Sequence, residues 1–102
     1  MMVLNEWEVE EMERRYYGSD IEPNMARATR ALARFVTWTN DHSDGWPYWP
    51  KPSRAARRLM EDIYRAHMDC RDLTPREVTM GLRSVKAFLT RQGADAASVL
   101  GD

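Results

Sequence analysis

Hydrophobic residues recur every three or four positions along most of the chain, which is the spacing of one face of an α-helix. The first such stretch predicts a helix from Glu6 to about Tyr17, capped by Asn5 and ended by Gly18. Trp7 falls nearly opposite the apolar face of this helix, among glutamates. The inward positions are Val9, Met12 and Tyr16.

A second amphipathic stretch follows Pro23. Asn24 can cap a helix that runs to about Thr39, and Arg27 and Arg34 point away from its apolar face. The apolar positions form a tight stripe of Met25, Ala28, Leu32, Phe35 and Trp38.

A third helix is predicted from Ser53, as its cap, to about Arg71. Its apolar stripe is Ala56, Leu59, Met60, Ile63, His67 and Cys70. Its outer face carries opposite charges at i,i+4 spacing, each pair worth a few tenths of a kcal/mol. These pairs are Arg57–Glu61, Arg58–Asp62 and Glu61–Arg65.

The strongest local signal in the chain is Thr74-Pro75-Arg76-Glu77, a capping box with proline at the first helical position. It predicts a fourth helix to about Gln92, ended by Gly93. Gly81 falls on the inner face, where it would permit a close helix crossing. The inward positions are Val78, Leu82, Val85, Phe88 and Leu89.

No window alternates polar and apolar residues as a strand would, so the expected fold is all-α. We expect residues 1–102 to form a single domain, a small bundle of about four helices. A loop rich in Trp and Pro joins the second and third helices, and the tail from about 94 to 102 would add one frayed turn.

Composition narrows the class of protein. An apolar fraction of 43% with four Trp is typical of a folded chain, and a net charge of −1 provides no global basic field for nucleic acid. A single cysteine excludes an internal disulfide and fits a reducing compartment. The glutamate-rich N-terminal stretch is unlike a signal peptide, and no apolar run approaches a membrane span. We therefore expect a soluble cytoplasmic protein without a membrane partner.

The loop between the second and third helices is the most unusual segment. Three aromatic residues and three prolines fall between Trp46 and Pro52. The prolines fix φ and favour extended geometry in the residues that precede them, so the loop is predicted to be stiff. Alternate residues of an extended segment project in opposite directions, so one or two rings would pack on the bundle and at least one, Tyr48, would stay partly exposed.

Basic residues follow these aromatic residues directly, at the start of the third helix. Aromatic residues beside arginine are typical of protein-binding surfaces. The predicted partner-binding residues are Trp46, Tyr48, Trp49, Lys51, Arg54, Arg57 and Arg58. The alternative is a small nucleic-acid-binding regulator that uses the same arginines, which Glu61 and Asp62 on the same helix disfavour.

The sequence offers only two sets of residues that could form a metal site or a catalytic site. His67 and Cys70 stand at i,i+3, but a zinc site needs two further ligands, and both residues fall on the expected core stripe. Asp41 to Asp44 contain the residue types of a hydrolase triad only as sequence neighbours, which favours a turn. We therefore predict no enzyme, no catalytic residue, no metal and no cofactor.

One resemblance bears on function. The run from Ser43 to Arg57, SDGWPYWPKPSRAAR, resembles a segment of small uncharacterised accessory proteins of actinobacteria and their phages. The resemblance implies a phage protein that binds and modulates a host protein, and it assigns no catalytic or binding residue. The expected function is thus a non-enzymatic protein–protein interaction module. Homo-oligomer formation is left open, since Trp7 lies off its helix's apolar face.

Overall fold

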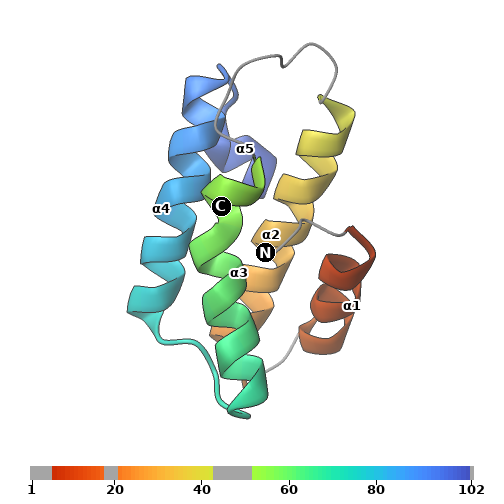
Figure 1. Cartoon of the computed structure of the whole chain (residues 1–102), viewed down its shortest axis with the longest axis vertical. Coiled ribbons are helices and arrows are strands. Elements are labelled where there is room, and N and C mark those ends of the chain that lie inside the picture. The colour runs from red at the N-terminus through yellow and green to blue at the C-terminus, as the bar shows by residue number, and fades with distance from the viewer. Residues whose placement is uncertain (1–5, 18–20, 43–51, 102) are drawn as a thin grey trace.

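The computed structural model describes residues 6–17, 21–42 and 52–101, with side chains from 9–17, 21–42 and 54–101. Every regular element in these ranges is a helix (Figure 1). The helices are α1 (Glu6–Tyr16), α2 (Pro23–Asp41), α3 (Pro52–Met68), α4 (Pro75–Arg91) and α5 (Ala96–Leu100). The prediction of an all-α fold built as a small helical bundle is confirmed. The Trp/Pro-rich segment 43–51 lies outside the described residues.

Helix α2 lies at the centre of the bundle and packs against all four other helices. Four of its five predicted core positions are buried, and Trp38 is partly buried. Because α2 has neighbours on several sides, its buried residues cover more of the helix surface than a single stripe, and they include two threonines. The hydroxyls of Thr29 and Thr39 donate to the carbonyls of Met25 and Val36 at 2.8 Å, so neither polar group lacks a partner.

Helix α1 packs on α2 through the face that the sequence predicts. Val9 and Tyr16 are buried, and Met12 packs against the core. The hydroxyl of Tyr16 is hydrogen-bonded to Nδ1 of His67 on α3, and the two rings meet edge to face at 6.0 Å. This contact ties α1 to α3, whereas the side chain of Trp7 lies outside the described residues.

Helices α3 and α4 cross closely at Gly81, as predicted. A Cβ atom placed on Gly81 would lie 2.8 Å from Cδ1 and 3.1 Å from Cα of Leu59. All five predicted inward positions of α4 are buried. One of them, Phe88, meets Phe35 of α2 edge to face at 5.6 Å, so α4 is fixed against both of its larger neighbours.

Helix α3 departs from its predicted pattern at both ends. It begins at Pro52, so Ser53 lies in the first turn and not at the cap, and it ends at Met68 and not near Arg71. Cys70, expected in the core, is exposed. Its φ of 54° places it in the left-handed region, where the Arg71 N–H donates to the Ala66 carbonyl at 3.0 Å. This bond closes the helix as a Schellman turn with cysteine in the position that favours glycine.

Replacing Cys70 with glycine should therefore raise the free energy of unfolding by about 0.5–1 kcal/mol, because glycine adopts this conformation without a Cβ penalty. Gly93 ends α4 in the same kind of turn, with φ 79° and with the Ala94 N–H donating to the Leu89 carbonyl at 3.0 Å. Gly93→Ala should therefore lower the free energy of unfolding by about 1 kcal/mol. Urea unfolding would measure both. Cys70→Ala controls for loss of the thiol, and an equal gain with alanine would contradict the backbone explanation.

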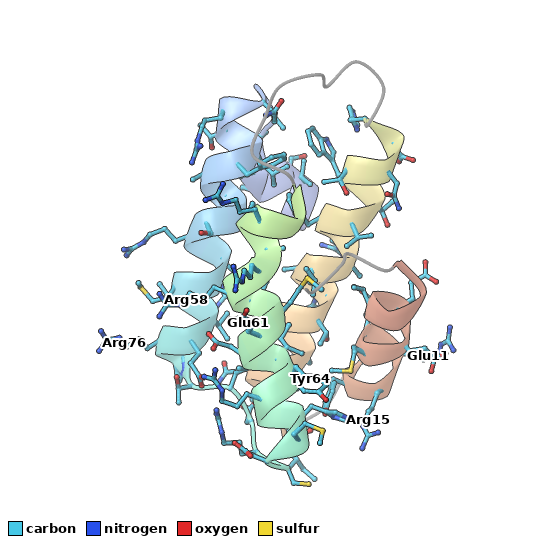
Figure 2. The ribbon with its side chains drawn as sticks, in the orientation of Figure 1. Glu11, Arg15, Arg58, Glu61, Tyr64 and Arg76 are labelled. Atoms are coloured by element: carbon cyan, nitrogen blue, oxygen red, sulfur yellow. The ribbon has the colours of Figure 1, made fainter. Side chains whose placement is uncertain are left out.

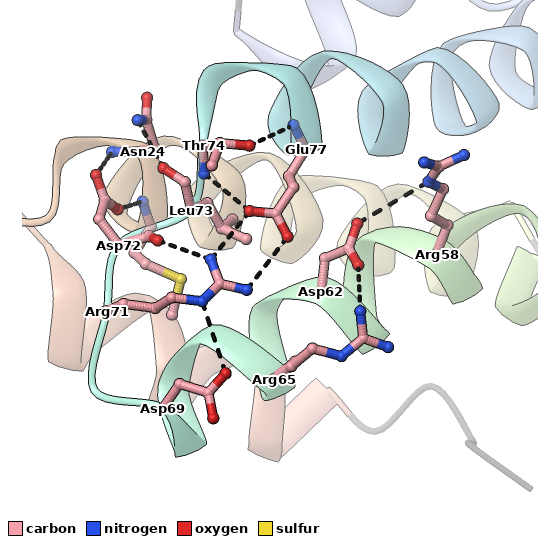
Figure 3. A network of polar contacts seen from close by, with 11 residues as sticks. Asn24, Arg58, Asp62, Arg65, Asp69, Arg71, Asp72, Leu73, Thr74 and Glu77 are labelled. Atoms are coloured by element: carbon pink, nitrogen blue, oxygen red, sulfur yellow. Dashed lines mark hydrogen bonds and ion pairs between the residues drawn. The ribbon is translucent and has the colours of Figure 1, made fainter.

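The N-terminus of α2 is capped by a side chain that lies far along the sequence but close in space. The sequence predicts Asn24 as the cap, but Asn24 is the second residue of the helix. The Asp72 carboxylate, in the segment between α3 and α4, accepts from the N–H of Met25 at 2.8 Å and of Asn24 at 3.3 Å (Figure 3). The Asn24 amide in turn donates to the Leu73 carbonyl at 2.8 Å. The prediction of Asn24 as the cap was thus wrong, because a residue far along the chain occupies that role.

The C-terminal segment forms α5, which packs between α2 and α4 (Figure 1). The Asp95 carboxylate accepts from the Ser98 N–H at 3.4 Å, and Leu100 is buried. Arg34 of α2 donates to the Leu100 carbonyl at 3.1 Å, so it binds α5 as well as facing away from the α2 core. Within the described ranges, every helix is too short or too polar to cross a membrane.

Candidate protein-binding face on α3

The predicted binding residues divide into two groups. Trp46, Tyr48, Trp49 and Lys51 lie outside the described residues. Arg54, Arg57 and Arg58 lie in the first two turns of α3, and all three are exposed. Their spacing of three and four residues places them on one side of the helix.

The same side of α3 continues to the end of the helix. Tyr64 is 58% exposed and Met68 is 61% exposed, and the two side chains are one helical turn apart, so they place adjacent apolar surface in solvent. Arg65 lies between them and is exposed. We call this side the α3 outer face; it consists of Arg54, Arg57, Arg58, Glu61, Tyr64, Arg65 and Met68.

Tyr64 and Met68 are absent from the predicted site. They stand seven and eleven residues after Arg57, which are both helical repeats of that position, so their place on the same face was accessible from the sequence. In Figure 2, Arg58, Glu61 and Tyr64 follow one another along α3 toward its C-terminal end. The face therefore changes from basic at its start to mixed apolar and basic at its end.

Ion pairs hold several of these arginines. The Arg57 Nε atom lies 2.9 Å from Glu61 Oε1, and Arg58 lies 3.9 Å from Asp62, as the i,i+4 spacing predicts. Arg65 lies 3.7 Å from Asp62, three residues before it, although the sequence predicted a pair with Glu61. The guanidinium groups thereby lie in defined positions on the surface, although exposed pairs of this kind stabilise the fold very little.

Asp62 is buried, although the sequence placed it on the outer face. It lies where α3 meets α4, with Arg58 and Arg65 on one side and Glu77 on the other (Figure 3). Burial, followed by the negative charge of Glu77, raises the pKa of Asp62 above its ordinary 3.8, against the opposing effect of the two arginines.

Glu77 shows the opposite behaviour. The predicted capping box is confirmed, since the Thr74 N–H donates to Glu77 Oε1 at 2.9 Å and the Glu77 N–H donates to Thr74 Oγ1 at 3.1 Å. Arg71 donates to the same carboxylate at 3.0 Å. The hydrogen bond from Arg71 is the main cause of a lowered pKa of Glu77, and the Thr74 backbone adds to it.

These two carboxyl groups should therefore affect stability in opposite directions. A raised pKa means that the stability contributed by Asp62 is full below pH 3.8 and is lost as the pH rises. Asp62→Asn should therefore raise the free energy of unfolding at about pH 7 by up to about 1 kcal/mol.

A lowered pKa means that the stability contributed by Glu77 is present above pH 4.5 and is lost as the pH falls. Glu77→Gln should therefore lower the free energy of unfolding at about pH 7 by about 1–2 kcal/mol. Urea unfolding at neutral and acidic pH tests both signs. The same sign for both variants at neutral pH would contradict the assignment.

Of the two chemical candidates, the structure describes His67 and Cys70 of the first but only Asp41 and His42 of the second, since Ser43 and Asp44 lie outside the described residues. His67 is partly buried and bonds Tyr16, while Cys70 is exposed beyond the end of α3. Asp41 is the last residue of α2, and the His42 ring stacks on Trp38 at 4.3 Å. Among the residues whose positions are described, no group of three or more His, Cys, Asp or Glu could hold a metal ion.

A groove of about 550 Å³ lies between α1, α2 and α5, and none of the described residues that line it comes from α3. Its charges are mixed, with Glu10, Glu13 and Asp41 opposite Arg30 and Arg34. Such a lining favours neither an anion nor a cation. The α3 outer face differs because its exposed charges are mainly of one sign.

The chemistry of the α3 outer face is thus four guanidinium groups, one carboxylate, one phenol ring and one thioether on the exposed side of a single helix. Arg, Tyr and Met are the residue types that protein interfaces favour. No family model, no curated protein and no solved structure matches this chain.

Proposed function

We propose that this chain is a non-enzymatic protein-interaction module that binds its partner through the α3 outer face. The observation that carries the proposal is the exposure of Tyr64 and Met68 on the same side of α3 as the arginines. Large apolar side chains left in water lose the stabilisation that burial would give, and a partner would restore it. The proposal includes Trp46, Tyr48, Trp49 and Lys51 as a second part of the surface, since they immediately precede α3.

The packing behind the face supports a binding role. Ala56, Leu59 and Ile63 bury the opposite side of α3, and Leu59 meets α4 at Gly81 with no space for a further atom. A helix held this closely presents its outer side chains without reorganising on binding. Such preorganisation lowers the entropy cost of association.

We also propose the class of partner, which is a host protein. The resemblance of residues 43–57 to accessory proteins of actinobacteria and their phages favours a phage-encoded chain acting on a host protein. The alternative, a nucleic-acid-binding regulator, is favoured by the four arginines on one helix face. It is disfavoured by Glu61, which lies on that face and would repel phosphate.

Affinity capture from a host lysate, quantified by mass spectrometry, tests the proposal. The double variant Tyr64→Ala/Met68→Ala should lose the partners that the wild type retains, because it removes the exposed apolar contacts. Both side chains are exposed, so we expect the stability to change by less than about 0.5 kcal/mol.

The matched control is Tyr17→Ala/Ile21→Ala, which removes two other exposed apolar side chains, 76% and 89% exposed, outside α3. It should retain all partners. Equal capture by the wild type and both double variants would exclude the α3 outer face as the binding surface. Trp46→Ala and Trp49→Ala, analysed in the same way, test the part of the surface that precedes α3.

A further inference from the structure

We infer that the α3 outer face binds an acidic amphipathic helix of its protein partner. This inference rests on the proposed function and adds the chemistry of the partner. Its basis is the unequal exposure of opposite charges on α3. The side chains of Arg57, Arg58 and Arg65 are 71%, 58% and 63% exposed, whereas Glu61 is 40% exposed and Asp62 only 11%.

The guanidinium groups thus extend into solvent while the carboxylates lie close to the helix. An approaching partner meets positive charge first, although the whole chain carries a net charge of −1. Arginine also suits carboxylates geometrically, because its planar group can donate two parallel hydrogen bonds to one carboxylate. Charge complementarity therefore favours a partner segment rich in Asp or Glu.

The spacing of the arginines favours a helical partner. Arg54, Arg58 and Arg65 stand at i, i+4 and i+11 on one side of α3, where they span about 16 Å of the helix axis, and Glu61 stands at i+7 between Arg58 and Arg65. A second helix packed alongside would present carboxylates with the same period. Tyr64 and Met68 are one turn apart and would contact apolar residues on the facing side of that helix.

Nucleic acid fits the same face less well. Glu61 accepts a hydrogen bond from Arg57 at 2.9 Å and keeps a negative charge among the arginines. A phosphate backbone would have to approach this carboxylate, whereas a protein helix can place an apolar or basic residue opposite it. Tyr64 is the single ring among the described residues of this face, whereas sites for single-stranded nucleic acid stack successive bases on several rings.

The test is a titration of labelled protein with a synthetic amphipathic helical peptide that carries Glu on one side and Leu beside it, followed by two-dimensional ¹H–¹⁵N NMR. Resonances of α3 should shift at peptide concentrations below about 1 mM. A control peptide with every Glu replaced by Gln should bind about five-fold more weakly or worse, and the difference should shrink in high salt.

A matched pair of protein variants locates the contact. Arg54→Gln/Arg65→Gln should weaken peptide binding about five-fold, whereas Arg76→Gln/Arg83→Gln, which removes two exposed arginines of α4, should not. All four side chains are exposed, so all variants should fold.

Three results would overturn the inference. The first is no shift of α3 resonances at about 1 mM peptide, or equal binding of the Gln peptide. The second is tighter binding of a single-stranded oligonucleotide that competes with the peptide. The third is self-association in sedimentation that Arg54→Gln/Arg65→Gln abolishes, since a second copy would then cover the face. If the peptide fails while Tyr64→Ala/Met68→Ala still loses captured partners, the proposed function stands and only the acidic chemistry is wrong.

Discussion

Replacing Gly81 with valine should lower the free energy of unfolding by about 3 kcal/mol, the upper part of the range for overpacked cores. A Cβ on residue 81 would lie 2.8 Å from Cδ1, 3.0 Å from Cβ and 3.1 Å from Cα of Leu59. The side-chain carbon Cδ1 can rotate away, but the Cα atom belongs to the backbone of α3. Relief therefore requires α3 and α4 to separate along their whole contact.

Alanine at the same position should cost less, about 1 kcal/mol, because it also gains about 1 kcal/mol of helix propensity over glycine. Ser84→Val is the control, since it places the same β-branched side chain on the exposed side of α4. Urea unfolding would compare the three variants. If Gly81→Val and Ser84→Val fall within about 0.5 kcal/mol of each other, the crossing does not constrain the bundle as the geometry indicates.

The close crossing was predictable from the sequence because it depends on a local pattern. Gly81 falls among the inward positions of α4, and only a residue without a side chain lets another helix approach there. The stripes of α1, α2 and α4 and the capping box at Thr74 are local in the same sense, since they depend on residues three or four positions apart.

The sequence predicts burial incorrectly for residues whose surroundings come from distant parts of the chain. Helical spacing predicts Asp62 on the outer face of α3, four residues after Arg58, but this side chain is buried where α3 meets α4 (Figure 3). Cys70 continues the apolar stripe of α3 by spacing alone, yet the chain turns away before it reaches the core. Helical periodicity tells which residues share a side, but not where the neighbouring helices end.

The candidate face was predicted only in part for the same reason. Arg54, Arg57 and Arg58 stood out because they follow the aromatic loop and cluster in sequence. Tyr64 and Met68 are single apolar residues in a helix, and their exposure depends on how much of α3 the neighbouring helices leave uncovered. That uncovered area is a property of the packed bundle.

The second large effect concerns Asp72. Replacing it with alanine should lower the free energy of unfolding by about 2–3 kcal/mol, because two backbone donors at the start of the central helix lose a charged acceptor. The bonds are those from Met25 at 2.8 Å and Asn24 at 3.3 Å, the positions that an N-cap side chain normally satisfies. The carboxylate also lies at the positive end of the α2 dipole.

Asp69→Ala is the matched control for Asp72→Ala. Asp69 is an exposed acid of the same connection, and its ion pair with Arg71 at 3.6 Å should contribute less than about 0.5 kcal/mol. Asp72→Asn should fall between the two, since an amide oxygen can still accept a hydrogen bond but carries no charge. Equal effects of the two alanine variants in urea unfolding would contradict the capping role.

Amide hydrogen exchange separates a local loss of the cap from a general loss of stability. In Asp72→Ala, exchange at Asn24 and Met25 should accelerate more than exchange at Phe35, which lies deep in the same helix. Asn24 also donates to the Leu73 carbonyl, so the connection between α3 and α4 remains attached by one bond in this variant. Uniform acceleration along α2 would show instead that the loss of Asp72 lowers the global stability of the bundle and not only that of the helix terminus.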